Sequence, residues 1–148
     1  MGLGIIVPAM PIRKKKRGCM IPLKHLKSQV QRVTGELLPN VPNKDIPLNI
    51  DVKHFCSIRE EEEGVGVITV ETIIGPTPAA LFRVQMSHVL EIRWDSPVTM
   101  EDVRREAYDI CSGLGNQISH ITSILSYELI GTHIIIPPNL NKEGFIVK

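Results

Sequence analysis

Histidine is the residue of this sequence best suited to metal binding or acid-base chemistry, and its five copies are scattered without a metal-ligand spacing. His54 and His88 both fall on the apolar side of alternating segments, so they can meet across neighbouring strands. Zinc would need further ligands of the right type beside such a pair. We therefore interpret both as core or dimer-interface histidines, and the sequence predicts no catalytic residue, no metal site and no cofactor.

The three cysteines, Cys19, Cys56 and Cys111, are widely separated. An odd, scattered set is typical of buried thiols in a reducing compartment rather than of a disulfide framework. Cys111 falls at the end of an expected helix, where the helix dipole would not stabilise a thiolate. No glycine-rich phosphate loop follows an expected strand. These patterns argue against an enzyme and favour a cytoplasmic location.

Two blocks of like charge could each bind a partner. The basic block is a candidate patch for phosphate, nucleic acid or anionic lipid, and consists of Arg13, Lys14, Lys15, Lys16 and Arg17. The acidic block, Glu60 to Gly64, is expected to be a solvated turn, because consecutive loop carboxylates diverge. The net charge is +1, so no global field recruits nucleic acid. We interpret the basic block as a solvated charge run and expect no nucleic-acid partner.

The first half of the chain predicts a sheet. Glycine, proline and the basic block interrupt residues 1–28, so we expect a flexible basic extension there and a single domain over residues 29–148. Strand patterns cover residues 29–38, 48–58, 65–74 and 80–93. Their connections are short, which favours antiparallel pairing. No apolar run approaches the roughly twenty residues that a membrane span requires.

The second half predicts helices. Thr99 and Asp102 resemble a capping box that begins a short helix. A longer helix follows and should end at Gly131, and its apolar stripe consists of Ile118, Ile121, Leu125 and Leu129. The isoleucine run 134–136 is too short for a helix and is stopped by two prolines. A helix rich in isoleucine and threonine depends on packing, so we expect it to lie against the sheet.

In this order, the segments resemble the export chaperone SecB and its SecB-like relatives. QVQRVTGELLP resembles the opening strand of that family, and VTMEDVRREAYDICSGLG resembles its crossover and short helix. The family's long helix, glycine turn, aliphatic run and Pro-Pro-hydrophobic-Asn motif correspond here to residues 118–130, Gly131, residues 134–136, and Pro137, Pro138 and Asn139. The resemblance covers about residues 29–141.

The resemblance implies an α+β fold: a four-stranded antiparallel Greek-key sheet with helices packed on one face. It implies an ATP-independent holdase that binds unfolded or extended polypeptides in apolar grooves and assembles as a homodimer or homotetramer. It also implies a link to protein export. The candidate groove residues are Trp94, Val98, Ile134 and Ile136. Trp94 has a second interpretation, in which a loop tryptophan closes the core.

Two departures limit the family's partnership with the ATPase SecA. SecB proteins meet SecA through a strongly acidic surface, whereas this chain is nearly neutral, and too few residues follow Leu140 for the family's further helix. We therefore do not expect SecA as a partner. Two alternatives remain open: a diverged, for example phage-related, assembly protein with the same fold and no client binding, and a binder of anionic surfaces or nucleic acid through the basic block.

The long helix also predicts an oligomer interface. Ile124, Tyr127 and Ile130 lie outside its apolar stripe, which gives the helix more apolar surface than one sheet face needs. A monomer would expose that surface as a patch. We expect it to be buried against a symmetry-related copy.

Overall fold

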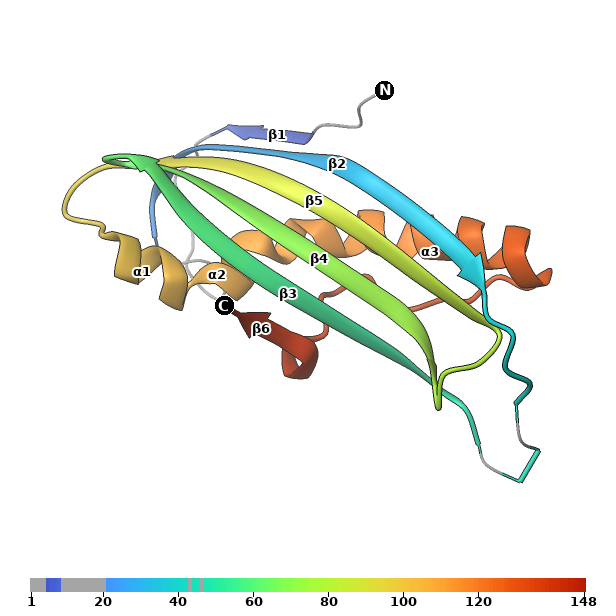
Figure 1. Ribbon diagram of the computed structural model, residues 1–148. Helices are drawn as coiled ribbons and strands as arrows, with labels where there is room; N and C mark the ends of the chain where they lie inside the picture. Colours follow the sequence, from blue (N-terminus) through green and yellow to red (C-terminus); the bar gives the residue numbers. More distant parts are fainter. Residues whose placement is uncertain (1–4, 9–20, 43, 46) are drawn as a thin grey trace.

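Four long strands and two short ones form one sheet (Figure 1). The computed structural model describes residues 5–8, 21–42, 44–45 and 47–148. Its strands are β1 (Ile5–Pro8), β2 (Leu23–Leu37), β3 (Asn49–Glu62), β4 (Val65–Thr77), β5 (Phe82–Trp94) and β6 (Phe145–Val147). The sheet has six strands in the order β1-β2-β5-β4-β3-β6. All neighbours pair antiparallel except β3 and β6, which are parallel.

The α+β class is confirmed, whereas the expected four-stranded antiparallel sheet is only the centre of the observed one. β2 lies beside β5 rather than beside its sequence neighbour β3, so the central order is β2-β5-β4-β3. β1 and β6 extend this centre to a six-stranded mixed sheet. Strands of three or four residues contain too few alternations to show a period, and for this reason the sequence pattern missed both.

The strands are longer than their patterns indicated. β2 begins at Leu23, so the expected domain boundary between residues 28 and 29 falls inside a continuous strand. β3 runs to Glu62, so most of the acidic block is strand rather than turn, and Gly64 with its φ of 78° makes the reversal. The basic block, residues 13–17, lies outside the described residues, and its role stays a prediction.

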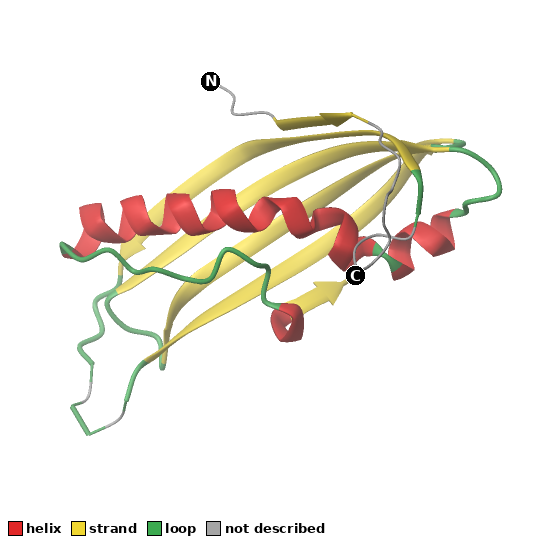
Figure 2. Cartoon of the chain, turned by 180° about the vertical axis from the view of Figure 1, so that it is seen from behind, coloured by secondary structure: helices red, strands yellow, loops and turns green. Residues whose placement is uncertain are grey.

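The helices all lie on one face of the sheet (Figure 2). They are α1 (Met100–Arg105), α2 (Ala107–Ile110), the 3₁₀ turn η1 (Cys111–Leu114) and α3 (Gly115–Ile130), and a second 3₁₀ turn, η2 (Lys142–Gly144), precedes β6. The capping box is confirmed, because the Asp102 amide donates to Thr99 Oγ1 and the Thr99 amide donates to Asp102 Oδ2. Gly131 ends α3 in the left-handed region, as predicted. None of the helices in the described residues is long and apolar enough to cross a membrane.

The core lies between the inner face of the sheet and the helices. Along β4, fully buried residues alternate with half-buried ones, because one face meets the helices and the other faces solvent. The largest fully buried side chains include Phe82, Ile68, Met86, Leu90 and Ile118. The buried positions of α3 are not only apolar, since Thr122 and Ser126 lie beside Ile118 on its covered face. The predicted stripe residues Ile121, Leu125 and Leu129 flank this line and are partly buried against the core.

Candidate functional site

Two buried histidines occupy the inner face of the sheet. His54 Nε2 accepts the Asn141 amide at 3.1 Å, so Nδ1 carries the proton and donates to Thr72 Oγ1 at 2.9 Å. Burial, together with the nearby His88, lowers the pKa of His54 to about 4. His88 lies 3.1 Å from Gln117 Oε1 through Nε2, while its buried Nδ1 makes no hydrogen bond within the described part of the chain. Both rings are therefore neutral core groups, which agrees with one of the two interpretations of the sequence.

The two described cysteines lie in the core. Cys56 and Cys111 are both fully buried. Hydrogen bonding to Cys56 and burial raise the pKa of the Cys111 thiol well above its usual value. Among the described residues, no group of three or more histidine, cysteine or acidic side chains is placed to hold a metal ion. The feature of the structure best suited to binding is an apolar cavity.

An apolar cavity opens between the start of α3, the strand β3 and the segment after α3. Its volume is about 190 Å³. Its apolar walls are formed by Val52 of β3, Ile118 of α3, and Ile136, Pro137 and Leu140. The polar residues of its lining are His54, Asn139, Asn141 and Lys142. Such a lining of aliphatic groups with a few fixed polar groups is typical of a binding pocket.

Serines on one flank of α3 position the wall of this cavity. The segment after Gly131 runs back along α3 (Figure 2). Ser126 Oγ accepts the Ile134 amide at 2.7 Å, and Ser119 Oγ donates to the Ile136 carbonyl at 2.8 Å. Between them, Ser123 Oγ lies 3.0 Å from His133 Nδ1. These three serines have helical spacing. Ser119 and Ser126 satisfy main-chain groups of a segment that has no regular structure of its own, and Ser123 contacts a side chain of the same segment.

The segment then passes so close to the start of α3 that only glycine fits there. A Cβ on Gly115 would lie 1.9 Å from the Pro138 carbonyl oxygen. Beyond this point, the Tyr108 hydroxyl donates to the Leu140 carbonyl at 3.0 Å, and Asn141 Nδ2 donates to the Val52 carbonyl at 2.7 Å. The cavity wall is thus fixed to α2, α3 and β3.

The four predicted groove residues do not form one surface. Ile136 lines the cavity, and Ile134 lies nearby on the flank of α3. Trp94, in contrast, is only 5% exposed, and a Cβ on Gly66 would lie 3.0 Å from its ring. It ends β5 at an inward position and closes the core, and half-buried Val98 follows it toward α1. The second interpretation of Trp94 is therefore the one that the structure supports.

The three predicted interface residues differ in how exposed they are. Ile124 is 46% exposed and Tyr127 50% exposed, on the side of α3 turned away from the sheet. The Tyr127 ring stacks on His133 with 4.6 Å between centroids. Ile130 is partly buried against the core of its own chain, so it is less available to a partner. An interface through α3 stays a prediction that rests on the first two residues.

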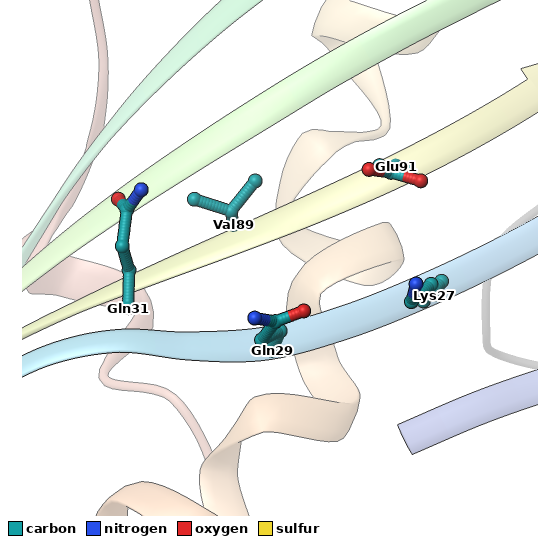
Figure 3. A pocket seen from close by; sticks show the side chains of 5 residues that line it. All are labelled: Lys27, Gln29, Gln31, Val89 and Glu91. Carbon is teal, nitrogen blue, oxygen red and sulfur yellow. The ribbon is translucent and has the colours of Figure 1, made fainter. Parts of the chain in front are cut away.

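The outer face of the sheet carries a second, polar hollow of about 220 Å³ (Figure 3). It lies over β2 and β5 and is lined by Lys27, Gln29, Gln31, Val89 and Glu91. In the register, Lys27 faces Glu91 and Gln29 faces Val89, and a bulge between Val30 and Arg32 adds Gln31 as an extra residue. Its lining combines two opposite charges with two amides. The hollow has no arrangement for catalysis and is less apolar than the cavity beside α3.

No protein-family model matches the chain, and no curated protein matches it in sequence. Its structure is similar to that of a solved SecB-like chaperone, Mycobacterium tuberculosis Rv1957 in complex with a ChAD peptide from the Rv1956 HigA1 antitoxin. The TM-score is 0.58 at 10% sequence identity, over 74% of this chain and 85% of that one. The chain therefore has the fold of a SecB-like chaperone, as the order of its sequence segments predicted.

Proposed function

We propose that this protein is a holdase-type chaperone that binds unfolded or extended polypeptides in the apolar cavity beside α3. The observation that carries the proposal is the cavity itself, with aliphatic walls from Val52, Ile118 and Ile136 and the polar groups of His54 and Asn141 in its lining. Aliphatic walls accept many side chains without selecting one, which suits clients of varied sequence. The similarity in fold to a SecB-like chaperone solved with a peptide supports the same class of ligand.

The first experiment follows aggregation of a chemically unfolded client by light scattering after dilution into buffer. We expect the protein to suppress the scattering at stoichiometric amounts without ATP. Val52→Ser should weaken the suppression, because it replaces a half-buried apolar wall with a hydroxyl. Ile50→Ser is the matched control, since Ile50 lies on the same side of β3 outside the cavity. Absence of suppression by the wild-type protein would refute the proposal.

The assembly alternative is favoured by a different observation, the exposure of Ile124 and Tyr127 on α3. We propose that this face joins copies of the chain into a homodimer or homotetramer. An assembly protein would form the same oligomer and leave the scattering of the unfolded client unchanged. Measuring mass and scattering on the same preparation therefore separates the two functions.

A further inference from the structure

The edge strand β3 is only partly covered. β3 spans 14 residues, from Asn49 to Glu62. On its outer edge, β6 pairs with His54, Phe55 and Cys56, and Asn141 Nδ2 occupies the Val52 carbonyl just before them. An edge strand with free main-chain groups is a template for another extended chain. The geometry of β6 shows what kind of chain fits there.

β6 lies on this edge in the manner of a short bound peptide. β6 pairs with β3 in parallel, unlike the other described strand pairs. Beyond β6, the Lys148 amide donates to the Cys56 carbonyl at 2.8 Å. Phe145 and Val147 are partly buried against the core, whereas Ile146 between them is 45% exposed. The alternation is that of any extended segment with one face on an apolar surface.

The side-chain contacts of β6 are limited. The Phe145 ring meets Tyr108 edge to face at 5.4 Å and lies 6.1 Å from the His54 ring. The three residues of the strand are each partly exposed. A strand this short, with no fully buried side chain, has little local stability and belongs to the part of a fold that opens most readily.

The covered edge is continuous with the proposed binding cavity. Val52 and His54 line the cavity, and His54 is also the β3 partner of Phe145. Peptides that extend a sheet gain affinity from main-chain hydrogen bonds and gain selectivity from pockets beside the edge. The β3 edge provides main-chain hydrogen-bonding groups, and the cavity beside it provides the pocket.

We propose that β6 is a displaceable occupant of the client site, and that a client segment binds by pairing with the β3 edge in its place. The inference rests on the proposed function. The partner is an extended polypeptide with alternating apolar side chains, which would take the positions of Phe145 and Val147. A client segment longer than β6 can also pair with β3 between Cys56 and Glu62, where β6 has no register partner. Without a client, β6 limits pairing between copies through this edge.

A disulfide across β6 and β3 tests the displacement. Phe55 and Ile146 are register partners on adjacent strands, whose spacing is within the Cα separation that a disulfide spans. We would combine Phe55→Cys with Ile146→Cys and oxidise the pair with oxidised glutathione, which takes up the two electrons and protons as it is reduced. The probe is fluorescently labelled, reduced and carboxymethylated α-lactalbumin, with binding followed by anisotropy. Wild-type protein given the same oxidant is the control.

We expect the oxidised variant to bind the probe at least about tenfold more weakly than the same variant after reduction. A loss of this size follows when the state with β6 displaced falls to a tenth of its population. Equal binding by the oxidised and reduced forms would overturn the role of β6 and leave the proposed function in place. Absence of binding by wild-type protein and by both forms would overturn the two together.

Loosening β6 is the complementary test. Phe145→Ser removes the ring that contacts Tyr108 and His54, so the same probe should bind more tightly than to the wild type. Ile146→Ser is the matched control, because this neighbour is already half exposed, and its affinity should stay unchanged. A circular-dichroism spectrum like that of the wild type establishes that each variant is folded. Unchanged affinity of a folded Phe145→Ser variant would contradict the proposal.

Discussion

Gly115→Ala should detach the wall of the cavity from α3. Gly115 begins the helix, and a Cβ there would lie 1.9 Å from the Pro138 carbonyl oxygen and 3.0 Å from Asn139 Cα. Ordinary contact begins at 3.4 Å, so the Pro138 carbonyl must withdraw by about 1.5 Å. A shift of that size breaks the 2.8 Å hydrogen bond from Ser119 to Ile136 or the one from Tyr108 to Leu140.

Competing terms decide the sign of the change in the free energy of unfolding. Alanine is the better helix former by about 1 kcal/mol, which by itself would stabilise the variant. Overpacking against a backbone costs about 1–3 kcal/mol, and each broken hydrogen bond costs about 1 kcal/mol more. The clash involves main-chain atoms rather than a flexible side chain, so the structure cannot relieve it by a change of rotamer. We therefore expect a net destabilisation of about 2 kcal/mol.

Gly113→Ala is the control for this measurement. Gly113 precedes the same helix by two positions in η1, and no atom lies within 4 Å of a Cβ placed there. Its variant should be neutral or slightly more stable, by less than about 1 kcal/mol. Urea unfolding of both variants, followed by circular dichroism, gives the comparison. Equal stability would mean that residues 136–140 do not pack on the start of α3 as described.

Three further predictions concern other parts of the molecule. The pKa of His54 is about 4 in the folded chain and about 6.5 when unfolded, so its stabilising contribution is present above pH 6.5 and is lost as the pH falls through 4. Urea unfolding should show that the free energy of unfolding is lower at acid pH than at pH 7 by about 3 kcal/mol. An equal free energy of unfolding at the two pH values would contradict the lowered pKa of His54. Ile124→Asp or Tyr127→Asp should reduce the oligomer mass in light scattering without changing the circular-dichroism spectrum, whereas Leu125→Asp, which packs on the core, should unfold the domain. Thr99→Ala should lower the free energy of unfolding by about 1 kcal/mol, because it removes the cap of α1; unaltered stability would argue against the capping box.

Local patterns were sufficient for much of the fold. The strand over residues 65–74, the capping box at Thr99 and the helix end at Gly131 each depend on a few adjacent residues, and each was predicted. β6 was not, because three residues carry no measurable period and its pairing is decided by a strand far away in sequence. The inward position of Trp94 follows from the alternation of β5, which the interpretation as a loop residue overlooked.

The candidate site was harder to predict, because its walls come from β3, α3 and the segment before β6. Only Ile136 of the four expected groove residues lines the cavity. The helical spacing of Ser119, Ser123 and Ser126 was visible in the sequence and could have indicated that a main-chain segment lies along α3. Nothing local distinguishes Gly115 from another helix glycine, since its role depends on Pro138 across the turn.

The position of β2 in the sheet has a consequence for how the chain folds during synthesis. β3, β4 and β5 are joined by short connections and can pair as soon as they leave the ribosome, but β2 pairs with β5 over residues 23–37 and 82–94. Contacts this distant in sequence form slowly. Until Trp94 has been made, the apolar residues of β2 have no complete strand to pair with. A nascent chain of this protein thus leaves β2 unpaired for some time, and β2 is then an apolar-containing segment of the kind that we propose the finished molecule binds.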